Sequence, residues 1–123
     1  MFKSILLVGL GGAIGSILRY LSSLFITRYF NSVFPLATFT VNIIGCFIIG
    51  LIFGYMEKEQ ITNDNIKFLF ITGFCGGYTT FSTFAIENVG LIQSEHTLSA
   101  FAYIAASIIT GLFAVWLGLI VFK

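Results

Sequence analysis

The residues of this chain best suited to binding an ion lie in one run, Gly76 to Phe84, with the sequence GGYTTFSTF. The run is rich in glycine and hydroxyl residues and poor in helix formers, which predicts a break in a membrane helix near residues 76–80. A broken helix exposes carbonyl groups on one half and N–H groups on the other. These groups can bind a cation and an anion respectively.

Two aromatic residues follow the predicted break. When the helix resumes, Phe81 and Phe84 are three residues apart and share one face. An aromatic ring has a positive edge, which can receive a small anion that has lost part of its water. The chain has 15 phenylalanines, and most of them must face lipid or pack against other side chains. The hydroxyls of Thr80, Ser82 and Thr83 set this pair apart and make it the first candidate for an anion path.

Three further polar residues lie in apolar surroundings, where each is costly unless it is buried in protein or faces water. Asn42, with Thr38 one turn before it, either forms a hydrogen bond between helices or lines a pore. Arg19 is either a cation that extends to the membrane surface or a fixed positive charge at the mouth of an aqueous cavity. Glu87 is expected at a vestibule or interface, towards the end of its span.

A stripe of hydroxyl groups is predicted on the last apolar stretch. Its members, at helical spacing, are Ser99, Tyr103, Ser107 and Thr110. Single hydroxyls in membrane helices usually bond to their own backbone, whereas a stripe of them favours a polar path or a seam between helices.

The chain carries no enzyme signature. Its one histidine, His96, lies in a polar turn, and no cluster of histidine, cysteine or acidic residues has metal-ligand spacing. The stretch Gly9 to Gly15 falls short of a dinucleotide-binding fingerprint because position 14 is isoleucine. The net charge of +1 and the lack of a basic run argue against nucleic acid as a partner. These features indicate a protein that is not an enzyme.

Four apolar stretches must hold these residues in place. The chain has 123 residues, 58% of them hydrophobic, with 6 basic and 5 acidic side chains. Residues 4–27, 36–56, 68–86 and 97–122 contain a single charge, Arg19. Each stretch is close to the roughly 20 residues that cross a bilayer as a helix. We predict an all-α membrane protein, with one four-helix transmembrane domain over residues 1–123 and spans at about 4–27, 35–56, 66–93 and 97–122.

The third span, residues 66–93, is longer than one straight crossing needs, which also favours a break near mid-membrane. Small residues four apart predict close contacts between helices. These pairs are Gly11 and Gly15, Gly50 and Gly54, Gly73 and Gly77, and Ala114 and Gly118.

Three motifs lie one in each of the first three apolar stretches. They are Gly11-Gly12-x-x-Gly15-x-x-x-Arg19-Tyr20, Thr40-Val41-Asn42-x-x-Gly45-x-Phe47-x-x-Gly50, and the run from Gly73 to Phe84. They closely resemble the motifs of the Fluc/CrcB fluoride channels, and the resemblance extends to length and number of spans. It implies an antiparallel, dual-topology homodimer with two pores in the cytoplasmic (inner) membrane. Such a dimer would pass fluoride passively out of the cytoplasm and so relieve fluoride toxicity.

The resemblance also implies roles for single residues. Phe81 and Phe84 would line the fluoride path, and Asn42 would stand at its polar end. The hydroxyls along the path would come from Thr80, Ser82, Thr83, Tyr103 and Ser107. Arg19 and Glu87 would belong to the vestibule. The main-chain carbonyls of Gly76 and Thr79, from both subunits, would hold a structural sodium ion at the dimer centre. Two positions depart from the family pattern: Ala37 replaces a common glycine, and Gly111 removes a hydroxyl at the end of the stripe.

Two other function classes are alternatives to a fluoride channel. A small proton-coupled multidrug exporter has four spans in about this length but needs a membrane-embedded carboxylate in its first span. The first span here has Arg19 and no acid. A non-conducting structural membrane subunit is the second alternative, if the glycines and hydroxyls only pack helices.

The positions of the basic residues bear on the orientation of the chain in the membrane. Lys3, Lys58, Lys67 and Lys123 fall on one side, which favours termini in the cytoplasm, although a weak bias can leave both orientations populated.

Overall fold

The computed structural model describes residues 1–123, and its only regular secondary structure is helical. Its elements are α1 (Phe2–Tyr29), α2 (Leu36–Lys58), α3 (Asp64–Ile66), η1 (Lys67–Cys75), α4 (Gly76–Tyr78), α5 (Phe81–Gln93) and α6 (Thr97–Ile120). Four helical segments are long and apolar enough to cross a membrane: α1, α2, α6 and the composite segment Asp64–Gln93. The predicted all-α chain with four spans is confirmed, and each helical segment begins and ends within two residues of its predicted span.

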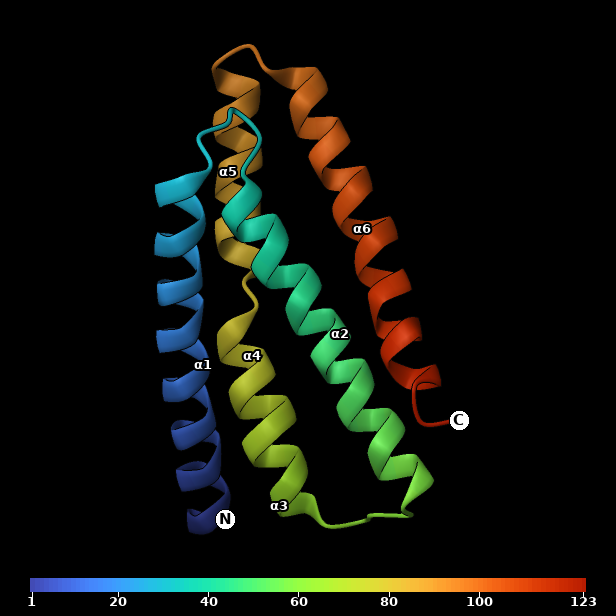
Figure 1. Ribbon diagram of the computed structural model, residues 1–123. Helices are drawn as coiled ribbons and strands as arrows, with labels where there is room; N and C mark the ends of the chain where they lie inside the picture. Colours follow the sequence, from blue (N-terminus) through green and yellow to red (C-terminus); the bar gives the residue numbers. More distant parts are fainter.

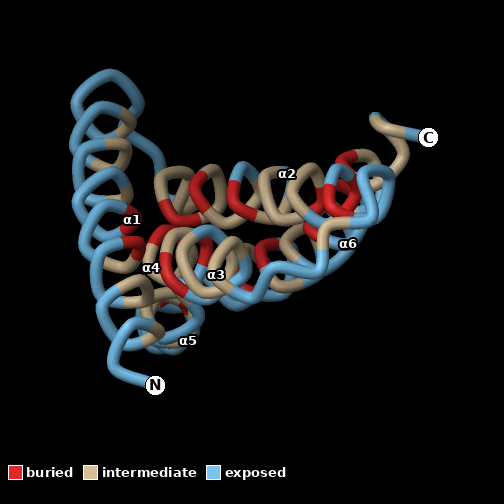
Figure 2. The backbone as a smooth tube through the Cα atoms, turned by 90° about the horizontal axis from the view of Figure 1, so that it is seen from below, coloured by how far each residue is buried: buried red, intermediate tan, exposed pale blue.

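The helices form a slanted array, with α1 beside the composite third span and α6 beside α2 (Figure 1). Both termini and the turn before α3 lie towards the lower end of Figure 1, as an even number of spans requires. Figure 2 shows that the buried residues of α1 face α4, whereas those of α2 lie along most of its length. Only 18 of 123 residues are buried, so most of the apolar surface must meet lipid or another chain.

Glycines allow α1 to touch the backbone of the third span. A β-carbon at position 77 would lie 2.6 Å from the Gly12 carbonyl oxygen, and one at position 73 would lie 2.9 Å from the Val8 carbonyl oxygen. Gly11 and Gly15 leave equally little room against the backbone of η1. The close packing predicted from the glycine spacing is therefore confirmed at this contact.

A second close contact joins α2 and α6. A β-carbon at Gly118 would lie 2.5 Å from the Phe47 carbonyl oxygen, and one at Gly54 would lie 2.8 Å from the Leu119 carbonyl oxygen. Gly50 and Ala114 are buried in the same region. Since lipid tails provide no hydrophobic force between helices, such backbone contacts supply van der Waals attraction that holds α2 and α6 together.

The first half of the third span contains a π-helix, which the sequence analysis did not predict. In η1 the Gly76 N–H bonds back to the Ile71 carbonyl, five residues earlier, rather than four as in an α-helix. The sequence KFLFITGFC gives no hydropathy period that separates the two patterns. The wider turn occurs where the glycines of α1 press against this backbone.

The third span breaks after Tyr78, inside the range predicted from the sequence. Thr79 (φ −84°, ψ 160°) and Thr80 (φ −149°, ψ 116°) are extended, so they separate α4 from α5. The Thr80 hydroxyl then accepts a hydrogen bond from the Thr83 N–H at 3.3 Å and caps the start of α5. Two consecutive threonines thus supply both the extended link and the cap of the following helix.

Candidate ion-binding site at the helix break

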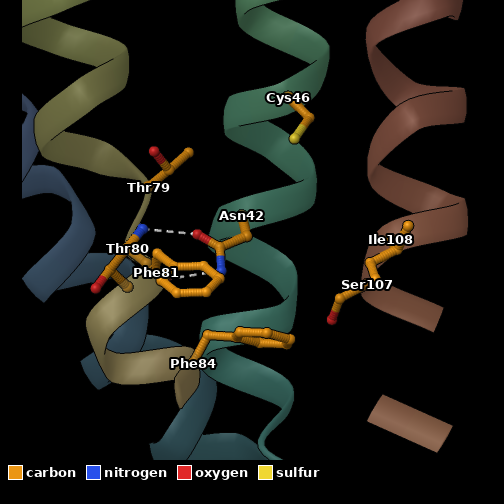
Figure 3. Close-up of a pocket in the computed structure, with 8 residues that line it drawn as sticks. All are labelled: Asn42, Cys46, Thr79, Thr80, Phe81, Phe84, Ser107 and Ile108. Carbon is orange, nitrogen blue, oxygen red and sulfur yellow. Dashed lines mark hydrogen bonds between the residues drawn. The ribbon is translucent and has the colours of Figure 1, made fainter. Parts of the chain in front are cut away.

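The side chain of Asn42, from α2, holds the break in place. Its Oδ1 accepts a hydrogen bond from the Thr80 N–H at 2.7 Å, and its Nδ2 donates one to the Thr80 carbonyl at 3.1 Å (Figure 3). In an uninterrupted α-helix the Thr80 N–H would bond to the Gly76 carbonyl. Asn42 therefore replaces a helical hydrogen bond. Of the two roles predicted for Asn42, the hydrogen bond between helices is present, because α2 bonds here to the third span.

The carbonyl groups at the end of α4 have different partners. The Cys75 carbonyl accepts hydrogen bonds from the Thr79 N–H at 3.0 Å and from the Thr79 hydroxyl at 2.9 Å. The Gly77 carbonyl accepts one from Arg19 Nε at 3.0 Å. The carbonyl of Gly76 loses its helical donor, the Thr80 N–H, to Asn42, and the carbonyl of Thr79 belongs to an extended residue. The break thus leaves main-chain oxygens that a cation could bind.

Arg19 lies beside the break, where its half-buried side chain binds the last turn of α4. The C-terminal end of a helix carries a partial negative charge, which a guanidinium group complements. This contact joins Arg19, the only charge within residues 4–27, to the third span. Sequence position alone does not reveal it, because Arg19 and Gly77 are 58 residues apart.

A pocket of about 290 Å³ opens next to the break. Its lining comes from α2, α5, α6 and the extended link: Asn42, Cys46, Thr79, Thr80, Phe81, Phe84, Ser107 and Ile108. Figure 3 shows these residues arranged around one space, with Asn42 and the two phenylalanines between the link and α6. Six of the eight are candidates from the sequence analysis, whereas Cys46 and Ile108 are apolar-span residues that it did not single out.

The two candidate rings lie close together in this pocket. The centroids of Phe81 and Phe84 are 5.7 Å apart, with the ring planes tilted by 43°. Phe84 also meets the ring of Tyr103 edge to face at 4.9 Å, so neighbouring groups fix its position. Phe81 is 78% exposed in the single chain, which leaves its ring available to an ion or to another chain.

Glu87 receives two hydrogen bonds from neighbouring helices. The Thr38 hydroxyl of α2 donates to Oε2 at 2.8 Å, and the Tyr103 hydroxyl of α6 donates to Oε1 at 3.0 Å. Tyr103 is fully buried. The spacing of Thr38 and Asn42 puts them on one helix face, but it does not pair Thr38 with Glu87. The link between α2, α5 and α6 depends on how the helices pack, which the sequence pattern does not specify.

The remaining hydroxyl candidates differ in their surroundings. The Thr83 hydroxyl accepts a hydrogen bond from the Thr80 hydroxyl at 3.0 Å, so the hydrogen of the Thr80 hydroxyl is already used at the start of α5. Ser82 is exposed. The hydroxyl of Ser107 is buried at the pocket and has no hydrogen-bond partner in the chain. Of the hydroxyls that line the pocket, those of Thr79 and Thr80 already donate within the chain, which leaves that of Ser107 to donate to a bound ion.

Four membrane-spanning helices, one of them broken beside a polar and aromatic pocket, define a small multi-span membrane protein with its candidate site at a helix break. A family model described as "CrcB-like protein, Camphor Resistance (CrcB)" matches residues 6–119. The chain belongs to this CrcB family, and the family resemblance expected from the three motifs is confirmed.

Curated relatives match over nearly the whole chain. A protein of Flavobacterium psychrophilum named "Fluoride-specific ion channel FluC" is 53% identical over 121 residues, which cover 98% of this chain and 98% of that protein. A protein of the same name from Azobacteroides pseudotrichonymphae is 50% identical, covering 98% of this chain and 96% of its own length. "Fluoride-specific ion channel FluC 2" of Rhodococcus jostii is 47% identical, covering 94% and 95%.

Proposed function

We propose that this chain forms a fluoride-selective channel, which lets fluoride leave the cytoplasm passively and so reduces fluoride toxicity. Close relatives named as fluoride-specific channels support this function over the whole chain length. The observation that carries it in the structure is the shared pocket: Phe81, Phe84 and Asn42 line one space beside the helix break. Ring edges and fixed N–H or O–H donors suit a small anion whose lost water must be replaced by close contacts.

The polar and aromatic groups of the site have defined tasks in this proposal. Nδ2 of Asn42 carries two hydrogens, and the Thr80 carbonyl takes only one, so the other can donate to fluoride. The Ser107 hydroxyl, which lacks a partner in the chain, supplies a second donor across the pocket. Phe81 and Phe84 receive the ion between them. Further hydroxyls along the path come from Thr80, Ser82, Thr83 and Tyr103, and the vestibule groups are Arg19 and Glu87.

The working unit in this proposal is an antiparallel homodimer, with the chain inserted in both orientations in the cytoplasmic (inner) membrane. Gly76 is exposed at the break and Phe81 is largely exposed on the adjoining half-helix, although both belong to the proposed site. A membrane helix that exposes irregular backbone needs protein or water against it. A second copy related by a two-fold axis would cover one break with the other.

A structural sodium ion at the dimer centre fits the groups left free at the break. Arg19 occupies the Gly77 carbonyl, and Asn42 removes the helical donor of the Gly76 carbonyl. The Gly76 and Thr79 carbonyls then remain as ligands, and hard cations prefer such oxygens. One chain provides too few of them for a complete site, whereas two copies supply the same pair twice. The bound ion would add a fixed positive charge that holds the two breaks together.

Fluoride efflux from liposomes that contain the purified chain is the direct test. The proposal expects efflux without a proton gradient, together with far slower chloride efflux from the same vesicles. A proton-coupled exporter would need the gradient, and a structural subunit would give no efflux. Equal rates for fluoride and chloride would contradict fluoride selectivity.

A further inference from the structure

The two cysteines of the chain line one cavity, although they lie 29 positions apart in the printed sequence. Cys46 belongs to α2 and Cys75 ends η1, and both are free thiols. The cavity that they share has a volume of about 200 Å³ and also contacts Gly76 and Thr79. Cys75 is only 3% exposed, so its thiol faces protein rather than lipid. No part of the proposed fluoride path uses these sulfur atoms.

This thiol cavity adjoins the pocket that holds the phenylalanine rings. Cys46 and Thr79 line both spaces, so they form the wall between them. Figure 3 shows Cys46 one helical turn from Asn42, above the pocket and beside α6. A β-carbon at Gly111 of α6 would lie 3.5 Å from the Cys46 sulfur, which places the thiol at the contact between α2 and α6. A ligand bound to the thiols would therefore touch both the pocket wall and the proposed sodium ligands.

We infer that Cys46 and Cys75 form a binding site for a soft, thiophilic metal cation such as Hg²⁺, and that occupation of this site blocks the fluoride path. Sulfur ligands select soft metal ions, whereas sodium selects the harder carbonyl oxygens nearby. Each thiol that binds the metal releases its proton to water, and no atom changes oxidation state. The block rests on the proposed fluoride function, whereas metal binding itself does not.

The chain offers a complete set of variants for the test, because it has no other cysteine. Cys46→Ser and Cys75→Ser keep nearly the same side-chain size but lose the soft ligand. We expect micromolar Hg²⁺, added as a chloride-free salt, to stop fluoride efflux from liposomes, and an excess of a small dithiol to restore it. Each single variant should need at least about tenfold more Hg²⁺ for the same block, and the double variant should resist it.

A second measurement does not depend on conduction. Intact-mass spectrometry of the detergent-solubilised chain after Hg²⁺ treatment should find one metal ion per chain in the parent and none in the double variant. If the parent binds Hg²⁺ in this way but never conducts fluoride, the proposed function fails and the metal site stands. Three results would overturn the inference: equal Hg²⁺ sensitivity in the parent and the double variant, dependence on one cysteine alone, or bound metal that leaves the flux of a conducting parent unchanged.

Discussion

Asn42 forms hydrogen bonds with both main-chain groups of Thr80, accepting at 2.7 Å and donating at 3.1 Å. One side chain therefore satisfies an N–H and a carbonyl that the break removes from the helical pattern. Asn42→Ala should leave both groups without a partner and lower the free energy of unfolding by about 1–3 kcal/mol. Thermal unfolding in detergent measures this loss.

Asn88→Ala is the matched control for that prediction. Asn88 is buried, whereas Asn42 is half-buried, but Nδ2 of Asn88 bonds only to the Phe84 carbonyl of its own helix, and its Oδ1 has no partner. Its removal should cost clearly less than the loss of Asn42. Equal losses for the two variants would show that the link to Thr80 adds nothing to stability.

Phe81→Ile and Phe84→Ile should each reduce fluoride efflux sharply while the protein remains folded, because the volume is roughly kept and the positive ring edge is lost. Phe25→Ile is a suitable control, since Phe25 is an exposed ring on α1 that does not line the pocket. Efflux from liposomes at equal protein density compares the three. Parent-like rates in both pocket variants would mean that the rings serve only packing.

Gly77→Ala should prevent correct packing of α1 against the break, because the new β-carbon would lie 2.6 Å from the Gly12 carbonyl oxygen. Gly90→Ala adds the same methyl group where no atom lies within 4 Å, and it should stabilise its helix by up to about 1 kcal/mol. Thr79→Ala loses only a hydroxyl bond to the Cys75 carbonyl of the preceding turn and should still fold. Size-exclusion chromatography and thermal unfolding rank the three variants, and a normally folded, conducting Gly77→Ala protein would contradict the close contact.

Tyr103→Phe should destabilise the chain by about 1.5–3 kcal/mol, because it removes a donor from the Glu87 carboxylate in a buried setting. Ser107→Ala removes a hydroxyl that has no partner in the chain, so it should leave thermal stability unchanged while it slows fluoride efflux. Unfolding and efflux measured on both variants compare the hydroxyl that binds Glu87 with the hydroxyl that has no partner in the chain. A loss of stability in Ser107→Ala alone would reverse these assignments.

Labelling from outside intact cells tests the antiparallel dimer. A single cysteine placed in the 57–65 loop, after Cys46 and Cys75 are replaced, reports the side on which that loop lies. Mixed insertion should expose the loop in roughly half of the molecules to an impermeant thiol reagent. A loop protected in every molecule of a protein that still conducts fluoride would rule out dual topology.

The segregation of charge was enough to predict the four helical spans, because burying a charge in lipid is costly wherever it falls. The glycine spacing likewise predicted a close contact between helices, and the glycines and threonines at residues 76–80 predicted the break. The contact of Arg19 with Gly77 and the bonds of Glu87 to Thr38 and Tyr103 were not predicted. They depend on which faces of different helices meet, and a single sequence does not contain that information. The π-helix of η1 was missed because its apolar sequence KFLFITGFC has no hydropathy period that separates a π-helix from an α-helix.

Because Thr79 and Thr80 are extended, the rotation of α5 about its axis is not fixed by that of α4. In a continuous helix, each residue turns by about 100°, so the face of Gly77 would fix the direction of Phe84. The link removes this constraint, and the two halves contact different neighbours: α4 packs against α1, whereas α5 packs against α6. A substitution that changes how one half packs against its neighbour therefore need not change the direction in which the other half faces the pocket.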